Sequence, residues 1–263
     1  MNSNDPIGIF DSGVGGTSIW KEIHQLLPLE HTIYLADSKY APYGNKTSEE
    51  ITALSIKNTE TLLEMGAKII VVACNTATTN AIDVLRNKYS IPIIGIEPAI
   101  KPAALNTTSK SIGILATKGT LSSALFHKTS EEFTKNIKVL EIVGEGLVPL
   151  IETGELESKA LQTLLKKYTA PMVKANIDYL VLGCSHYPYL IPQLEELLPN
   201  NVTIIDSGQA VARQTKKLLE DLQLLRKDSS KPALQFYTNK EVAPLAMLLK
   251  DFSEEIKISK KDF

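Results

Sequence analysis

The second half of this chain repeats its first half, at a spacing far longer than that of solenoid repeats. Residues 57–76 align without a gap on residues 167–186. The alignment places Cys74 on Cys184, 110 positions later, and these are the only two cysteines of the chain. A repeat of this length predicts two similar folding units, each of which carries one thiol at the same place.

Two further pairs of segments support the repeat. Residues 7–12 match residues 112–117, and each segment is an apolar run that continues into a small polar loop. The apolar residues 93–94 match residues 203–204, and a turn follows each pair. The matching segments therefore extend over most of both halves of the chain.

Short apolar runs alternate with longer amphipathic segments, which is the pattern of an α/β fold. The runs are rich in Ile and Val and apolar on both faces, as expected for parallel strands that helices cover on two sides. They lie at 7–10, 32–36, 69–73, 91–96, 111–116, 138–143, 179–183 and 202–205, and a helix at 210–225 and a strand at 234–237 follow. The sequence predicts two similar α/β domains with mainly parallel sheets, related by pseudo-twofold symmetry, with the active site in the cleft between them.

The composition excludes several classes of protein. The net charge is −2 and the basic residues are scattered, so the chain lacks the basic patch of a nucleic-acid binder. Residues 1–5 lack the basic flank of a signal peptide, and no stretch approaches the roughly 18 apolar residues of a membrane span. Two cysteines among 263 residues cannot form a disulfide framework. We expect a cytoplasmic protein with two free thiols and no membrane or nucleic-acid partner.

Both cysteines directly follow a predicted strand and precede a predicted helix. Ligands of parallel α/β sheets bind beyond the carboxyl ends of the strands, and a helix N-terminus there favours thiolate. A single such cysteine could simply pack in the core, but two at equivalent positions favour a functional pair. Neither has a second ligand at zinc spacing, so no metal site is expected. A redox pair stays open, although the Cys-x-x-Cys arrangement is missing.

Two thiols that face each other across a cleft suit racemisation. The reaction removes a weakly acidic proton from one face of a carbon and delivers another proton to the opposite face. The unperturbed pKa of cysteine, about 8.5, allows one group to be held as thiolate and the other as thiol near neutrality. The developing carbanion needs fixed hydrogen-bond donors around its carboxylate.

Several loops could supply these donors. The glycines of residues 11–17 permit a close backbone approach to a carboxylate or phosphate. Their spacing differs from the dinucleotide motif Gly-x-Gly-x-x-Gly, so a nucleotide-binding module is a remote alternative. Asp37 and the turn at 41–44 follow the second predicted strand. The turn alone is more often only a turn.

The segments after the two cysteines carry further candidates. Asn75, Thr76 and Ser185 are natural helix caps and also candidate substrate ligands. His186 lies two positions after Cys184, which suggests an acid or base, although a structural histidine is an equal alternative. Glu152 by itself has the pattern of a solvated helix residue.

The motifs together resemble those of the bacterial glutamate racemases, within the aspartate/glutamate racemase superfamily. The match is ordered and spans nearly the whole chain. The motifs are Asp11-Ser12-Gly13-Val14-Gly15-Gly16, Ala36-Asp37 with Pro42-Tyr43-Gly44, Ala73-Cys74-Asn75-Thr76, Gly183-Cys184-Ser185-His186-Tyr187-Pro188 and Asp206-Ser207-Gly208. The histidine of the fourth motif separates the glutamate enzymes from the similar aspartate racemases, so aspartate is the alternative substrate.

The resemblance implies catalysis without pyridoxal phosphate, metal or nucleotide, with Cys74 and Cys184 as the two acid/base groups. Asp11 would assist Cys74, and His186, supported by Glu152, would assist Cys184. The residues implied in binding glutamate are Asp11, Ser12, Tyr43, Gly44, Asn75, Thr76, Thr117, Thr120, Ser185 and His186.

The resemblance also has consequences beyond the site. It implies a role in supplying D-glutamate for peptidoglycan, and a homodimer. It favours the return of the C-terminal segment to the first unit, which gives domains of 1–97 with 210–263, and of 98–209. Two positions depart from the family pattern. Ser185 stands where threonine is usual, and Ala116 stands where a glycine often precedes Thr117.

Overall fold

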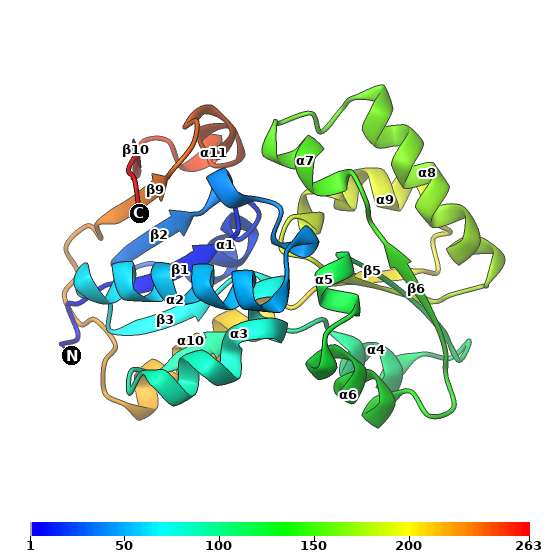
Figure 1. Cartoon of the computed structure of the whole chain (residues 1–263), viewed down its shortest axis with the longest axis horizontal. Helices are drawn as coiled ribbons and strands as arrows, with labels where there is room; N and C mark the ends of the chain where they lie inside the picture. Colours follow the sequence, from blue (N-terminus) through cyan, green and yellow to red (C-terminus); the bar gives the residue numbers. More distant parts are fainter. Residues whose placement is uncertain (1) are drawn as a thin grey trace.

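Every apolar run that the sequence predicts as a strand forms one in the computed structural model, which describes residues 2–263 (Figure 1). The strands are β1 (Ile7–Asp11), β2 (Thr32–Ala36), β3 (Ile69–Val72), β4 (Ile93–Gly95), β5 (Ser111–Ala116), β6 (Lys138–Val143), β7 (Tyr179–Gly183), β8 (Thr203–Ile205), β9 (Leu234–Thr238) and β10 (Ile256–Lys260). All pairings among them are parallel. Only β10 was not predicted, because it is a partly exposed edge strand in which Lys257 and Lys260 interrupt the apolar pattern.

Helices connect the strands. They are α1 (Thr17–Leu26), α2 (Ser48–Glu64), α3 (Asn75–Lys88), α4 (Ile100–Asn106), α5 (Lys118–Leu121), α6 (Ala124–Phe133), α7 (Leu147–Glu152), α8 (Lys159–Lys174), α9 (Ile191–Leu197), α10 (Gly208–Asp221) and α11 (Ala243–Leu248), with 3-10 turns η1 (Ser38–Tyr40), η2 (Tyr43–Asn45), η3 (Tyr187–Leu190) and η4 (Lys250–Phe252). Local sequence sets several of the starts. At α2, Thr47 and Glu50 form a reciprocal capping box. The predicted helix at 210–225 is α10.

Four neighbouring strands of the first sheet, β2-β1-β3-β4, have the same order as the four strands of the second, which confirms the internal repeat. The first sheet is ordered β10-β9-β2-β1-β3-β4 and the second β6-β5-β7-β8. Ile7 pairs with Ile69 in the first sheet, and the equivalent residues 112 and 179 pair in the second. One detail differs from the sequence alignment. Ile70 pairs with Ile93, whereas its equivalent at 180 pairs with Ile204, so the offset at this strand is 111 positions and not 110.

Alternating side chains of the strands fill a core on each face of both sheets. In the first half, Ile7 and Ile9 face the buried side chains of α1 and α10, and Phe10 faces those of α2 and α3. In the second half, Leu180 and Leu182 belong to the same large cluster as residues of α8 and α9. This cluster contains residues of both halves, so the halves share a continuous apolar core.

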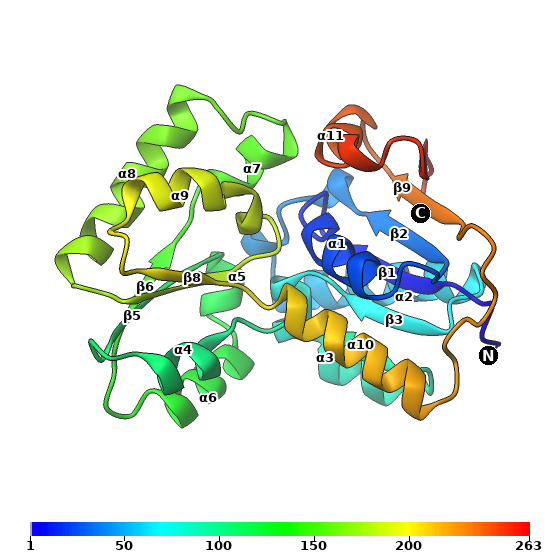
Figure 2. The ribbon, with the colours of Figure 1, turned by 180° about the vertical axis from the view of Figure 1, so that it is seen from behind.

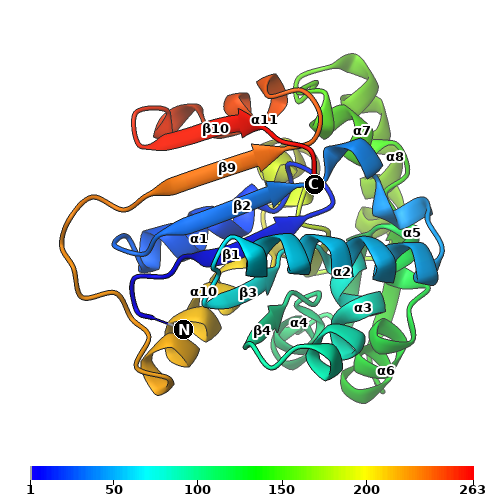
Figure 3. The ribbon, with the colours of Figure 1, turned by 60° about the vertical axis from the view of Figure 1, so that its left-hand side comes forward.

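The chain passes between the halves twice. It leaves the first half between β4 and α4 and returns between β8 and α10, which runs along the first half (Figure 2). The Ser207 hydroxyl donates to the Glu97 carbonyl and joins the two crossings. Strands β9 and β10 then extend the first sheet beyond β2 (Figure 3). The expected return of the C-terminal segment to the first unit is therefore found, while the domain boundaries at 97/98 and 209/210 stay a prediction.

Candidate active site

The carboxyl ends of β1, β3, β5 and β7 meet at a small inner cavity between the two halves. The residues that line it are Ser12, Pro42, Tyr43, Gly44, Cys74, Asn75, Thr76, Thr117, Val148, Cys184, Ser185 and His186. Most of the site residues expected from the sequence therefore lie together at this cavity. Three nominated residues, Asp11, Glu152 and Thr120, lie behind this lining.

Cys74 caps helix α3. Its Sγ accepts a hydrogen bond from the Ala77 amide at 3.4 Å, and the thiol donates to Ser12 Oγ at 3.5 Å. The cap is thus the cysteine itself and not Asn75 or Thr76. Burial, and next the negative charge of Asp11, raise the pKa of Cys74 well above its usual range, against the amide and Ser12. The helix amide favours thiolate at Cys74, as expected, but desolvation outweighs it and the net effect favours the thiol.

Cys184 has a different local environment. The helix α9 does not begin at this strand end, because the 3-10 turn η3 comes first. Cys184 Sγ lies 3.7 Å from His186 Nδ1. The two thiols are equivalent in the repeat, but a helix amide contacts one and an imidazole the other.

His186 and Glu152 form a buried pair behind Cys184. His186 Nε2 lies 2.6 Å from Glu152 Oε1. Burial alone would lower the pKa of His186, but the hydrogen bonds to Cys184 and Glu152 and the charge of Asp11 raise it well above its usual range. For Glu152, burial is again the largest effect and would raise its pKa, but hydrogen bonds, led by that of His186, lower the pKa below its usual value. An imidazolium and a carboxylate therefore face each other at neutral pH.

Asp11 is bonded to the second half. Its carboxylate accepts hydrogen bonds from the Gly13 amide at 2.9 Å and from the Ser185 hydroxyl at 2.9 Å. Burial raises the pKa of Asp11, and the charge of His186 opposes this effect. The structure shows no hydrogen bond from Asp11 to Cys74, so Asp11 acts on that thiol through its charge. This contact uses the hydroxyl of Ser185.

The glycine-rich loop after β1 packs against the His186–Glu152 pair. A Cβ at Gly13 would lie 1.9 Å from Glu152 Oε1, and one at Gly15 would lie 2.2 Å from His186 Nδ1. These glycines therefore permit a close approach of the loop to protein side chains. The expected approach of the loop backbone to a ligand stays a prediction.

Asn75 presents an unpaired amide to the cavity. The residue is only 2% exposed, yet neither its Nδ2 nor its Oδ1 has a hydrogen-bond partner within residues 2–263. Buried polar groups are normally hydrogen-bonded, and an orphaned one costs free energy. This amide is therefore a candidate ligand for a polar substrate.

Three threonine hydroxyls meet beside the cavity. Thr76 of the first half lies 2.8 Å from Thr117 and 3.2 Å from Thr120 of the second half, measured between Oγ1 atoms. Thr117 also caps α5 by accepting from the Thr120 amide. The nominated threonines thus bridge the halves, and those at 76 and 117 also line the cavity.

The Tyr43 hydroxyl is already engaged. It donates to Asp37, and Asp37 also accepts from Lys57, Asn58 and Asn239. The last three residues were missed in the sequence because no local pattern shows that they converge on one carboxylate. The cluster fixes the loop of η2, so that Tyr43 can reach a ligand with its ring or backbone but not with a free hydroxyl.

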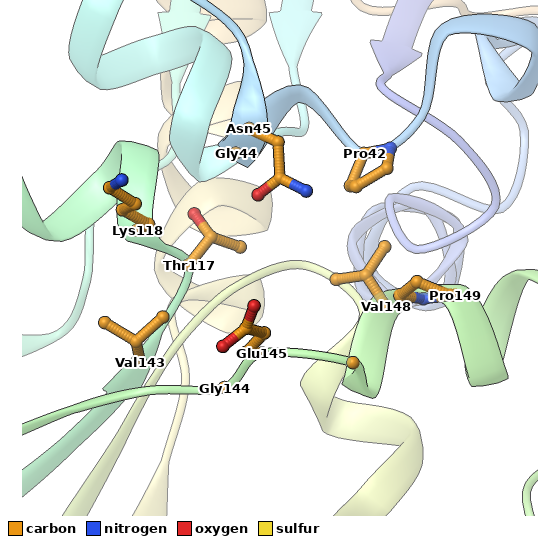
Figure 4. Close-up of a pocket in the computed structure, with 11 residues that line it drawn as sticks. Pro42, Gly44, Asn45, Thr117, Lys118, Val143, Gly144, Glu145, Val148 and Pro149 are labelled. Atoms are coloured by element: carbon orange, nitrogen blue, oxygen red, sulfur yellow. The ribbon is translucent and has the colours of Figure 1, made fainter.

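The inner cavity is nearly closed. Its volume is about 10 Å³, which is room for about one water molecule. Outside it lies a pocket of about 330 Å³ between η2 and the segment before α7. Figure 4 shows Asn45 and Glu145 on opposite sides of this pocket. A Cβ at Gly44 would lie 2.9 Å from Thr117 Cβ, so this contact separates the pocket from the cavity. As it stands, the inner cavity is too small to hold an amino acid.

Among residues 2–263, no three His, Cys, Asp or Glu side chains gather in a way that could hold a metal ion. Within the same residues, no helix is long and apolar enough to cross a membrane.

Each of the two similar α/β halves contributes one buried thiol to the cavity between them. This arrangement is that of an enzyme whose active site lies between two pseudo-symmetric units. The chain belongs to the Asp/Glu/Hydantoin racemase family, whose model matches residues 7–215. Among its curated relatives, the glutamate racemase of Ectopseudomonas mendocina is 48% identical over 85% of each chain. The glutamate racemase of Herpetosiphon aurantiacus is 43% identical over 93% of this chain and 96% of its own.

Solved structures of glutamate racemases share the whole fold. The isoform RacE1 from Bacillus anthracis matches with a TM-score of 0.87 at 30% identity, over 100% of this chain and 99% of its own. The Escherichia coli glutamate racemase, solved with L-glutamate and the activator UDP-MurNAc-Ala, matches with a TM-score of 0.86 at 33% identity, over 97% and 98%. The predicted fold and the racemase class are confirmed.

Proposed function

We propose that this racemase interconverts L- and D-glutamate by a two-base mechanism in which Cys74 and Cys184 act at opposite faces of the α carbon. One observation carries the proposal: two buried thiols, from equivalent strand ends of the two halves, line the same cavity. The curated relatives named above are glutamate racemases, and one of the similar structures holds L-glutamate.

The surroundings of Cys74 indicate its protonation in the free enzyme. The raised pKa of Cys74 makes it the protonated partner, which donates. We therefore assign the first proton abstraction to the other thiol, Cys184, whose Sγ lies 3.7 Å from His186 Nδ1. After one turnover the two thiols have exchanged roles. The reaction of the opposite enantiomer then follows the same path in reverse.

The polar lining of the cavity suits an amino acid with two carboxylates. The Asn75 amide and the hydroxyls of Ser12, Thr76 and Thr117 are donors that could hold the carboxylates. Backbone groups at Tyr43–Gly44 and Ser185–His186 would complete the binding of the amino and carboxylate groups. Fixed donors of this kind stabilise the charge that develops on the carboxylate when the α proton leaves.

Asn75→Ala is expected to raise KM for glutamate by about 10- to 100-fold, because one hydrogen bond to a charged group contributes about 1.5–3 kcal/mol. The melting temperature should not fall, because the replaced amide has no partner in the free protein. Steady-state kinetics and thermal unfolding check both results. A marked loss of stability with an unchanged KM would assign Asn75 to the structure.

The substrate can be tested directly. Dialysed protein with no added cofactor is incubated with L-glutamate or with L-aspartate, and both enantiomers are measured by chiral chromatography. We expect D-glutamate to form much faster than D-aspartate. Faster racemisation of aspartate would select the alternative substrate, and racemisation of neither would refute the proposal.

The proposed activity has a role in the cell. The protein would supply D-glutamate for peptidoglycan from the cytoplasm, where its two cysteines remain free thiols. We also propose a homodimer, which sedimentation of the purified protein would test by its mass.

A further inference from the structure

We propose that Ser38, from the first half, is a positioning residue that holds Glu152 of the second half against His186 and so prepares Cys184 for proton transfer. The inference rests on the proposed racemase function. Ser38 is the first residue of η1 and is separated from the end of β2 by Asp37; it does not line the cavity or contact either thiol. Its role would therefore be exerted through other residues.

The Glu152 carboxylate is held from both halves. Its Oε1 accepts from the Val14 amide at 2.6 Å and lies 2.6 Å from His186 Nε2. Its Oε2 accepts from the Ser38 hydroxyl at 2.8 Å. Val14 and Ser38 belong to the first half, whereas Glu152 is the last residue of α7, at the edge of the second half that faces the first (Figure 1). The carboxylate acquires its full set of donors only when the halves are together.

Burial makes these donors important. Ser38 is 5% exposed and His186 1% exposed. A carboxylate in such surroundings stays ionised only if hydrogen bonds replace the lost water. The Ser38 hydroxyl is the only partner of Glu152 Oε2 within residues 2–263. Without it, one oxygen of the carboxylate is unpaired and its orientation toward His186 is no longer fixed.

Hydrogen bonds of the neighbouring residues fix the backbone on both sides of Ser38. The preceding Asp37 accepts hydrogen bonds from four side chains, and the Lys39 amide donates to Asn239 Oδ1 at 2.9 Å. On the other side of the carboxylate, Gly13 leaves no room for a Cβ. The Ser38 backbone and the Gly13 loop, which contact Glu152 from two sides, are therefore preorganised. A residue that orients an acid/base pair needs such fixed surroundings.

The first test needs no activity. The side-chain nitrogens of ¹⁵N-labelled histidine are titrated by NMR in the wild type and in Ser38→Ala, Ser38→Thr and Ser55→Ala, with His186 assigned from the loss of its signal in His186→Asn. We expect the titration midpoint of His186 to fall by about one pH unit in Ser38→Ala, because a poorly held carboxylate stabilises the imidazolium less. Ser38→Thr, which keeps the hydroxyl, should restore it.

Ser55→Ala is the matched control. Ser55 is also buried in the first half, but its hydroxyl donates to the Ile51 carbonyl within α2. Within residues 2–263, no hydrogen bond connects this hydroxyl to Glu152. It should leave the His186 midpoint unchanged. An unmoved midpoint in Ser38→Ala, or an equal shift in Ser55→Ala, would overturn the inference.

The second test is kinetic. For Ser38→Ala we expect kcat to fall about 10-fold, a part of the 10²–10⁴-fold that a positioned acid or base contributes, with KM changed less than about 3-fold. The acid limb of the pH profile should move to higher pH, because Glu152 loses a donor that lowers its pKa. An unchanged profile contradicts the inference. If the wild type does not racemise glutamate, the proposed function fails, and the NMR titration still decides the role of Ser38.

Discussion

Replacing either Cys74 or Cys184 with serine is expected to lower kcat/KM for glutamate racemisation by about 10³-fold or more, because a serine hydroxyl ionises far too weakly to exchange the α proton. L- and D-glutamate have equal free energies in water. The loss of kcat/KM must therefore be the same in both directions for each variant, whichever thiol is removed. Chiral chromatography of reactions started from each enantiomer measures both losses.

The two serine variants should differ in partial reactions. Each variant keeps one thiol, which can still remove and return a proton on its own face of the carbon. In deuterated water, each variant should exchange the α hydrogen of one enantiomer without inversion, and the two variants should favour opposite enantiomers. Exchange of the same enantiomer by both variants would contradict the placement of the thiols on opposite faces. A variant that keeps more than a tenth of the wild-type activity would remove that cysteine from the mechanism.

Lys68→Met should destabilise the fold by about 3–5 kcal/mol, because it leaves a buried carboxylate without its counterion. Lys68 is fully buried and paired with Glu30, which is 3% exposed. The ammonium also donates to the carbonyls of Ser3 at 2.6 Å and Leu224 at 2.9 Å. The pair ties the N-terminal segment and the region after α10 to the first sheet.

An exposed ion pair supplies the control for this prediction. Lys88 and Glu60 are 2.9 Å apart, with side chains 46% and 48% exposed, so Lys88→Met should move the unfolding midpoint much less than Lys68→Met does. Urea unfolding of both variants gives the comparison. Equal midpoints for the two variants would show that the buried pair does not hold the fold together. Lys68 lies before β3, at the opposite end of the strand from Cys74, so kcat should be unchanged wherever the variant is folded.

The positions of the strands could be predicted from the sequence because the repeat is carried by buried apolar runs, whose pattern is local. The same holds for the placing of Cys74 and Cys184, since each lies at the end of such a run. The protonation of Cys74 could not be predicted in this way. Its pKa depends on desolvation and on Asp11, which is 63 positions away in the sequence.

The contacts between the halves could not be predicted from the sequence either. Glu152 had the pattern of a solvated helix residue, but the structure gives it a buried place against His186, Val14 and Ser38. Only the family resemblance had singled it out. Ser38 had no signal of its own, because its partner lies 114 positions away. Such a pairing depends on how the two units dock, and periodicity within one unit carries no information about docking.

The most direct test of two-base racemisation follows one isotope. Wild-type protein with no added cofactor is incubated with L-glutamate in deuterated water, and each enantiomer is analysed by mass spectrometry at low conversion. We predict that the D-glutamate formed carries one deuterium at the α carbon, whereas the remaining L-glutamate carries much less. D-glutamate that retains the original α hydrogen would contradict the account, because one group would then have carried that proton from one face to the other.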